Sequence, residues 1–321
     1  MLSFEMIQDA AKVLDGVAIV TPLLESSLLN ESLGFRLLVK AECLQRTGSF
    51  KMRGAYVKIS SLSEAERNAG VVAYSSGNHA QGVAAAAAAM NVVATIVMPA
   101  DAPAIKLQNT ASYGANVITY DRATGDRAKI AQAVSKDTGA TLIPPYDDYV
   151  LMSGQGTVGL EVAKQLEPLS TLADVLICPV GGGGLIAGIA TAMAALSPQT
   201  KIYASEPDNF DDTRRSLLAG ERVENEPGHD SICDSIVTQM PGAKTFPINE
   251  NYLEGGFSVS HDETLTAMKI LATQFKLVSE PGAAVALAAA LKHRDELLGK
   301  TVVVIVSGGN LDLEKFRSYI G

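Results

Sequence analysis

The chain has 321 residues, of which 47% are hydrophobic and 19% are charged, and this composition is typical of a globular protein with roughly two domains. The net charge of −9 argues against general nucleic-acid binding, which requires a basic surface. No basic segment followed by an apolar run opens the sequence, and the uncharged stretch 82–100 divides into an alanine-rich half and a β-branched half. We therefore expect a cytoplasmic protein with no signal peptide, no membrane span and no nucleic-acid partner.

Short apolar strands alternate with helices along the chain. In chain order, we expect a strand at 71–74, a helix at 81–90, strands at 92–98 and 116–120, helices at 123–138 and 157–165, a strand at 175–178, a helix at 185–196, a strand at 201–205, helices at 262–275 and 283–298, and a strand at 301–306. This alternation predicts an α/β protein with mostly parallel sheets, whose strands are buried on both faces.

The paired prolines Pro144 and Pro145 predict a domain boundary, because they cannot continue a helix or a central strand. They leave 41–144 as a smaller domain and 1–40 together with 145–321 as a larger one, with a ligand cleft expected between the two. The three cysteines are widely spaced and do not form a disulfide framework, so we expect buried thiols at Cys43, Cys178 and Cys233.

One lysine stands in a short segment of small and aromatic residues, Thr47-Gly48-Ser49-Phe50-Lys51-Met52-Arg53-Gly54-Ala55. A lysine amine is the group that forms an imine with an aldehyde cofactor. Alone the segment is a weak signal, because short strings of this kind occur by chance.

Four consecutive glycines, Gly181 to Gly184, follow a predicted strand and precede a predicted helix. Such a loop brings backbone amides close to a ligand, and the start of the helix adds free N–H groups, so the pattern predicts a phosphate cradle. Gly182, Gly184 and Gly188 also imitate a dinucleotide-binding motif, with Glu206 at the end of the next strand. A nicotinamide-dependent oxidoreductase is therefore an alternative, although the glycine spacing departs from the usual one.

Two further polar segments follow predicted strands. Ser75-Ser76-Gly77-Asn78-His79 opens a helix, where side-chain donors and free amides could accept a carboxylate, the alternative being simple helix capping by Ser76 or Asn78. Ser307-Gly308-Gly309-Asn310 follows the last strand. Ligands of open α/β sheets bind at such carboxyl ends of strands.

An acidic segment, Glu206-Pro207-Asp208-Asn209-Phe210-Asp211-Asp212, crowds four carboxylates into seven residues. Crowded acids repel one another unless they are solvated or bind a hard cation such as Mg²⁺ or Ca²⁺. A metal site and a solvated acidic loop that caps the next helix are both open at this point.

Together these segments resemble the serine/threonine dehydratase and serine racemase family of pyridoxal-phosphate (PLP) enzymes. The resemblance implies PLP fold type II, a tryptophan-synthase-β-like arrangement of two open, mostly parallel twisted sheets flanked by helices. Since the sequence stops at Gly321, we expect the short form without a regulatory domain, and the family implies a homodimer. The matching segments are Ser49–Ala55, Ser75–Gln81, Pro179–Gly184, Glu280-Pro281 and Ser307–Asn310.

The resemblance also implies a role for each candidate residue. Lys51 would bond to the cofactor and move the Cα proton, and Ser76 would be a second acid/base on the opposite side of Cα. The cofactor would contact Phe50, Lys51, Asn78, Gly181, Gly182, Gly183, Gly184 and Ser307. The substrate would contact Ser75, Ser76, Asn78, His79 and Arg127. A divalent ion, Mg²⁺ or else Ca²⁺ or Mn²⁺, would bind Glu206, the carbonyl of Phe210 and Asp212.

A neutral serine, Ser307, at the pyridine nitrogen makes the ring a weaker electron sink and favours loss of a β-hydroxyl. We therefore expect a PLP-dependent dehydratase (ammonia-lyase) that converts serine, threonine or 3-hydroxyaspartate to a 2-oxo acid and ammonia. A β-carboxylate would need an extra cation, for which Arg127 and His79 are the candidates, the alternative for Arg127 being an exposed helix arginine. Cys233-Asp234-Ser235 replaces the Ala-Asp-Gly of many family members and leaves the preferred substrate open. An amino-acid racemase, a bifunctional racemase-dehydratase and a catalytically silent amino-acid-binding protein are the remaining alternatives.

Overall fold

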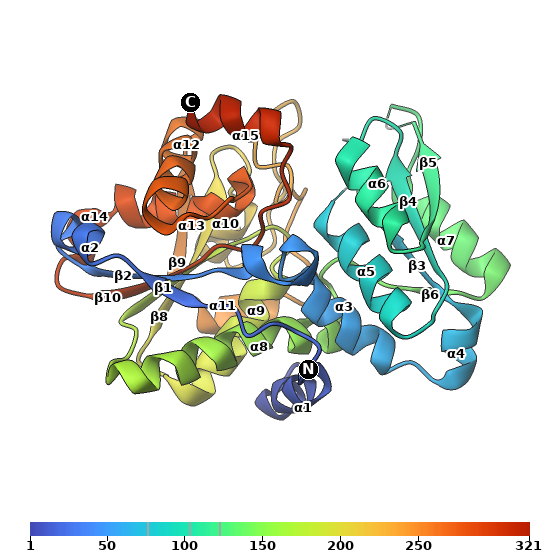
Figure 1. Ribbon diagram of the computed structural model, residues 1–321, viewed down its shortest axis with the longest axis horizontal. Helices are drawn as coiled ribbons and strands as arrows, with labels where there is room; N and C mark the ends of the chain where they lie inside the picture. Colours follow the sequence, from blue (N-terminus) through green and yellow to red (C-terminus); the bar gives the residue numbers. More distant parts are fainter. Residues whose placement is uncertain (76, 103, 122) are drawn as a thin grey trace.

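The computed structural model describes the whole chain except Ser76, Pro103, Arg122 and the side chain of Ile105. The strands are β1 Leu23–Glu25, β2 Arg36–Lys40, β3 Val71–Tyr74, β4 Ala94–Pro99, β5 Asn116–Tyr120, β6 Thr141–Leu142, β7 Val175–Pro179, β8 Lys201–Pro207, β9 Gly255–Val259 and β10 Thr301–Ile305. They form two separate sheets, which lie on opposite sides of the molecule (Figure 1).

The helices surround both sheets. They are α1 Phe4–Leu14, α2 Ser27–Leu33, α3 Lys51–Ser60, α4 Glu64–Ala69, α5 Asn78–Ala89, α6 Ala104–Ser112, α7 Arg127–Thr138, α8 Tyr149–Leu166, α9 Gly184–Leu196, α10 Asp212–Ala219, α11 Phe246–Tyr252, α12 His261–Ile270, α13 Pro281–Lys292, α14 Arg294–Leu297 and α15 Leu313–Ile320. Short 3-10 turns are η1 Glu42–Leu44, η2 Arg46–Gly48 and η3 Glu167–Leu169, and a π-helical turn, η4 Leu271–Phe275, extends α12.

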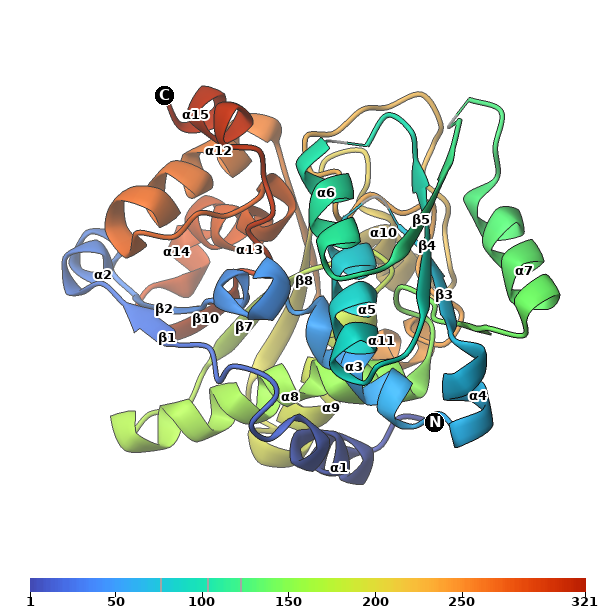
Figure 2. The ribbon, with the colours of Figure 1, turned by 45° about the vertical axis from the view of Figure 1, so that its right-hand side comes forward.

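The larger sheet has the strand order β1-β2-β10-β7-β8-β9, and every pair is parallel except β1 with β2. Its central strands are buried on both faces, as their uninterrupted apolar runs predict. Alternate residues of these strands pack against α12 and α13 on one face and against α8 and α9 on the other. Figure 2 shows α8 and α9 below this sheet and α12 and α13 above it.

The smaller sheet has the strand order β5-β4-β3-β6 and is entirely parallel. One face packs against α3 and α5, and the other contacts α7. The two sheets confirm the predicted α/β class with mostly parallel strands. The predicted domain limits, 1–40 with 145–321 and 41–144, stay a prediction.

Several predicted helices have different limits in the structure. The helix expected at 157–165 begins at Tyr149, because the Asp148 side chain caps it by accepting from the backbone N–H of Leu151 at 3.0 Å. The helix expected at 283–298 ends at Lys292, and a separate short helix follows. Residues 51–60 carry no predicted element, although they form α3 and bury Met52 and Ile59.

The thiols of Cys43, Cys178 and Cys233 are buried and unpaired, as expected. No helix in the described part of the chain combines the length and the apolar character needed to cross a membrane.

Candidate active site

A cavity opens between the two sheets, at the carboxyl ends of β3, β7 and β10. It brings together most of the predicted site residues, namely Phe50, Lys51, Ser75, Asn78, His79, Arg127, Gly181, Gly182, Gly183, Gly184 and Ser307. Ser76, the predicted second acid/base, lies outside the described residues. The predicted metal ligands Glu206, Phe210 and Asp212 are not among the residues that line this cavity.

Backbone hydrogen bonds attach the Lys51 segment to the loop after β10. The N–H of Phe50 donates to the carbonyl of Ser307 at 3.1 Å, and the N–H of Gly309 donates to the carbonyl of Gly48 at 2.9 Å. These bonds join segments about 260 residues apart in sequence. The lysine at the start of α3 and the serine at the end of β10 are therefore held on the same side of the cavity.

The amine of Lys51 donates to the carbonyl of Pro145 at 2.6 Å and lies 5.2 Å from the centre of the Phe50 ring. Loss of hydration lowers the pKa of this amine to about 8, although the nearby carboxyl group of Glu280 opposes the change. A larger share of the amine is thus neutral near pH 7 than for an exposed lysine. Only the neutral form can attack an aldehyde or remove a proton.

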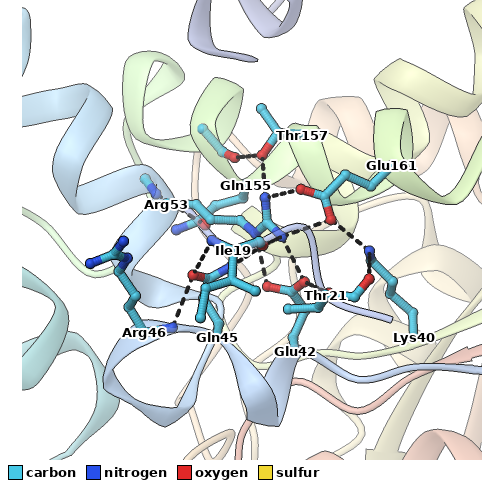
Figure 3. A network of polar contacts seen from close by, with 12 residues as sticks. Ile19, Thr21, Lys40, Glu42, Gln45, Arg46, Arg53, Gln155, Thr157 and Glu161 are labelled. Atoms are coloured by element: carbon cyan, nitrogen blue, oxygen red, sulfur yellow. Dashed lines mark hydrogen bonds and ion pairs between the residues drawn. The ribbon is translucent and has the colours of Figure 1, made fainter. Parts of the chain in front are cut away.

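A buried network of charges holds the helix that begins with Lys51 (Figure 3). Arg53, one half-turn along α3, donates to both carboxyl oxygens of Glu42 at 2.8 and 2.9 Å and to both of Glu161 at 2.6 and 2.9 Å. The amine of Lys40 donates to Glu161 at 2.5 Å and to the side-chain oxygen of Gln165 at 3.0 Å. Two cations face two carboxylates, so the network has no net charge.

The glycine loop turns directly from β7 into α9. Gly183 has φ of +89°, a conformation that glycine adopts without strain. A Cβ atom on Gly182 would overlap the ring of Tyr146, and one on Gly181 would lie 3.1 Å from the carbonyl oxygen of Ile236. The close packing leaves room for backbone only, and the amides at the start of α9 make the loop suitable for an anionic group.

Of the two candidate capping residues in the polar loop after β3, Ser76 lies outside the described residues and Asn78 does not cap the helix. The N-cap of α5 is Gly77, which has no side chain, so Asn78 does not cap the helix. The Nε2 of His79 hydrogen-bonds the carbonyl of Ile143 at 2.9 Å, and its Nδ1 has no partner among the described residues. Burial and the charge of Lys51 lower the pKa of His79 to about 3. Since His79 is neutral, it lines the cavity but cannot supply the extra cation for a β-carboxylate.

Two other cations reach the cavity. The guanidinium of Arg127 lies 5.8 Å from the centre of the Tyr74 ring and lines the cavity wall. The amine of Lys106 pairs with Asp234 at 3.1 Å and is almost fully buried. A Cβ atom on Gly77, in the predicted carboxylate loop, would lie only 3.5 Å from this amine. Arg127 and Lys106 thus supply positive charge to this part of the cavity wall.

The acidic segment runs from the end of β8 into α10, and three of its four carboxylates are buried while Asp208 is exposed. Glu206 is fully buried and caps α10, since its carboxylate accepts from the backbone N–H groups of Thr213 and Arg214 at 2.9 and 2.8 Å. Asp212 accepts from the Asn225 amide at 2.6 Å. Burial, followed by repulsion between the two acids, raises the pKa of Glu206 well above its usual value. Within the described residues, no group of three or more His, Cys, Asp or Glu residues is arranged to hold a metal ion.

Several residues that line the cavity were not predicted from the sequence, among them Lys106, Tyr146 and Glu280. Lys106 and Tyr146 carry no local signal, because they reach the cavity only through the packing of α6 and of the loop after β6. Glu280 belongs to a segment that matches the family but has no predicted role. The available signal is Pro281. Proline is common at the first position of a helix, so the residue before it stands where a loop ends and the helix begins.

The chain is similar to known proteins over nearly its whole length. A family model described as pyridoxal-phosphate dependent enzyme matches residues 14–308. The chain belongs to this family. Its cavity fits the cofactor, because a lysine amine of lowered pKa and the glycine loop at the start of α9 line the same cavity.

Individual relatives show the same extent of similarity. An L-threo-3-hydroxyaspartate ammonia-lyase of Saccharomyces cerevisiae is 43% identical over 94% of this chain and 90% of its own length. A crystal structure of a threonine deaminase from T.th. has a TM-score of 0.91 at 43% identity and covers 97% of this chain and 99% of its own. The structure of serine racemase from Dictyostelium discoideum has a TM-score of 0.89 at 39% identity and covers 97% of this chain and 99% of its own. These neighbours confirm the fold and the PLP-dependent class.

The packing also accounts for the glycines that imitate a dinucleotide motif. A Cβ atom on Gly188 would meet the backbone of Met152 and Gly156 at 2.5 Å, so this glycine allows α8 and α9 to pack closely. The family membership and these contacts together argue against the nicotinamide alternative.

Proposed function

We propose that this protein is an ammonia-lyase that eliminates the β-hydroxyl of a 3-hydroxy amino acid and yields a 2-oxo acid and ammonia. The observation that carries the proposal is the amine of Lys51, whose pKa is lowered to about 8 and which lines the same cavity as the glycine loop and the polar loop after β3. The names of the relatives, two ammonia-lyases or deaminases and one racemase, support the same class of substrate.

The bound cofactor would hold the substrate amino group and withdraw electrons from its Cα. Gly181 to Gly184 would bind its phosphate through backbone amides, and Phe50, Asn78 and Ser307 would contact its ring. Ser307 is neutral, so it does not enforce a positive charge on the ring nitrogen. In this arrangement the neutral amine of Lys51 would remove the α proton of the substrate. The Cβ–O bond would then break and the β-hydroxyl would leave as water, with a proton that the ammonium group of Lys51 can return. A second water would hydrolyse the imine form of the product to the 2-oxo acid and ammonia.

The substrate carboxylate would bind at the start of α5, where Ser75, Ser76, Asn78 and His79 precede or begin the helix. Free backbone N–H groups at a helix start attract an anion. His79 contributes shape rather than charge, because it is neutral. Ser76 remains the proposed second acid/base that would support racemisation as a side reaction.

The proposal is tested with purified protein loaded with the cofactor and a panel of serine, threonine and 3-hydroxyaspartate stereoisomers. We expect a 2-oxo acid and ammonia, absorbance of the bound cofactor, and a borohydride-fixed adduct on the peptide that contains Lys51. The Lys51→Ala variant should lose this adduct and all turnover. Turnover by that variant would refute the assignment, and a mirror-image amino acid as the main product would favour the racemase alternative.

We further propose that the substrate has a second carboxylate, as in 3-hydroxyaspartate, which Arg127 and Lys106 bind. Charge-assisted hydrogen bonds contribute about 1.5–3 kcal/mol, so Arg127→Gln should raise KM for hydroxyaspartate by roughly 10- to 100-fold and change KM for serine little. Lys136→Gln is the matched control, since Lys136 lies in the last turn of the same helix, away from the cavity. An equal effect on both substrates would contradict the second carboxylate.

A divalent cation at Glu206, the Phe210 carbonyl and Asp212 is part of the proposal. The two buried carboxylates suit a hard cation, because burial and their mutual repulsion make two negative charges unfavourable there. Removal of the ion with a chelator should lower both the unfolding temperature and activity, and Mg²⁺ should restore them. A chelated protein with unchanged unfolding temperature would exclude the site. A homodimer and a cytoplasmic location are also proposed, and size-exclusion chromatography with light scattering tests the first.

A further inference from the structure

Glu280 is a buried carboxyl group in the cavity wall that the proposed reaction does not use. It precedes Pro281 at the start of α13, is only 1% exposed and lines the same cavity as Lys51. One carboxyl oxygen accepts from the side-chain amide of Asn78 at 2.5 Å, and the other has no partner among the described residues. A Cβ atom on Gly308 would overlap the first oxygen, so the loop after β10 is shaped around this side chain.

The contact of Glu280 with Asn78 completes a chain of side-chain bonds across the cavity. The Asn78 carbonyl oxygen accepts from the amide of Asn310 at 2.8 Å, and Asn310 also donates to the carbonyl of Thr47 at 2.7 Å. Both ends of the Asn78 amide are therefore fixed. Asn78 keeps a second amide N–H, which it can offer to a ligand in the cavity.

We propose that Glu280 is a positioning residue that orients Asn78 toward the cofactor and, through its negative charge, sets the pH at which Lys51 becomes neutral. The inference deepens the proposed function, on which it rests, because it explains how the same site controls its base. The effect of Glu280 on Lys51 involves only the protein's own residues, so it can be measured before any cofactor is added.

The charged and titratable groups around Glu280 come from several elements. Lys51 of α3 and Lys106 of α6 are positive, Asp234 is negative, and the thiols of Cys43 and Cys233 are uncharged because burial raises their pKa to about 12. Burial raises the pKa of Glu280 to about 7, and repulsion from Asp234 adds to it, while Lys106 and Lys51 oppose the change.

The two groups lose their protons in sequence as the pH rises. Glu280 ionises near pH 7, and Lys51 becomes neutral near pH 8. The negative charge of Glu280 is therefore present when Lys51 titrates, and it favours the protonated amine. Removal of this charge should make Lys51 neutral at a lower pH.

The test is competitive labelling of lysines with acetic anhydride in the cofactor-free full-length protein, read by mass spectrometry from pH 5 to 10. The exposed Lys12 serves as an internal reference. In Glu280→Gln, which keeps the size of the side chain, the midpoint for Lys51 should fall by about half a pH unit or more. Asp234→Asn is the control, because Asp234 lines the cavity and acts on Glu280 but does not contribute to the pKa of Lys51. In this variant the labelling midpoint of Lys51 should stay unchanged. An unchanged midpoint in Glu280→Gln would overturn the charge effect.

The positioning part is tested by comparing Glu280→Gln with Glu280→Ala. Both variants lack the charge, but only the alanine variant releases the Asn78 amide. We expect the dissociation constant for pyridoxal phosphate to rise at least about fivefold more in the alanine variant than in the glutamine variant. Equal constants would show that Glu280 does not orient Asn78. Both readouts precede turnover, so they stay informative even if the protein proves to catalyse another reaction.

Discussion

Replacement of Arg53 should destabilise the protein far more than replacement of an arginine in an exposed ion pair. Arg53 is 1% exposed and faces Glu42, which is fully buried, and Glu161, which is 14% exposed. In Arg53→Met, only Lys40 would remain to balance two carboxylates. Removal of one partner from a buried ion pair costs about 3–5 kcal/mol, because the other charge stays buried without compensation. We expect a loss of that size in the free energy of unfolding.

Arg36 offers a matched control with the same chemistry in a wetter place. It donates to both carboxyl oxygens of Glu25 at 2.8 and 2.9 Å, but both side chains are about one third exposed. Arg36→Met should therefore cost no more than about 1 kcal/mol. Urea unfolding followed by circular dichroism measures both variants, and the slope with urea concentration should be unchanged.

A double variant separates the charge from the packing. Glu42→Gln together with Arg53→Met restores neutrality, so its cost should fall short of the sum of the two single variants by about 2 kcal/mol or more. The interpretation of the network would be refuted if the costs of the two substitutions were additive. It would also be refuted if Arg53→Met lowered the free energy of unfolding no more than Arg36→Met. In both cases the Lys51 helix would have to be held by apolar packing alone.

Two further predictions concern the cavity itself. Because the pKa of Glu280 is raised from 4.5 to about 7 in the folded protein, the unfolded chain releases this proton first, and stability falls as the pH rises through that interval. Glu280→Gln should thus stabilise the cofactor-free protein by about 3 kcal/mol at pH 8 and not at pH 4, measured by urea unfolding; equal effects at both pH values would contradict this. Gly182→Ala should displace the Tyr146 ring and weaken pyridoxal-phosphate binding, measured by fluorescence titration. Tyr146→Ala in the same chain should restore part of the affinity, and no restoration would show that the ring is not the obstacle.

The sequence predicted the buried strands β3, β4, β7, β8 and β10, because continuous apolar runs such as Val302–Ile305 leave few alternatives. It missed β2, which is equally buried, and the short or less buried strands β1, β6 and β9. It was weaker for helices whose start depends on a single side chain. The cap of α8 is Asp148, which lies well before the residues 157–165 whose pattern indicated the helix. Helix α3 was not predicted because Lys51 and Arg53 interrupt its apolar face, and both are held by partners distant in sequence.

The site was predictable where chemistry is concentrated in a short segment and not where it comes from packing. Lys51, Gly181 to Gly184 and Ser307 stand in recognisable motifs, and the structure places them around one cavity. Lys106 has no such motif, and its amine reaches the cavity because α6 packs beside α5. The charge of His79 could not be read from the sequence either, since its neutrality follows from burial beside Lys51.

The connections across the cavity explain why Asn78 matters to both sides. The segment that carries Lys51 is attached by backbone bonds to the loop after β10 on the larger sheet, whereas Asn78 begins a helix that packs on the smaller sheet. Its bonds to Glu280 and Asn310 link positions 202 and 232 residues away. The side chain proposed to contact the cofactor thus links the start of α5 to the start of α13 and to the loop after β10.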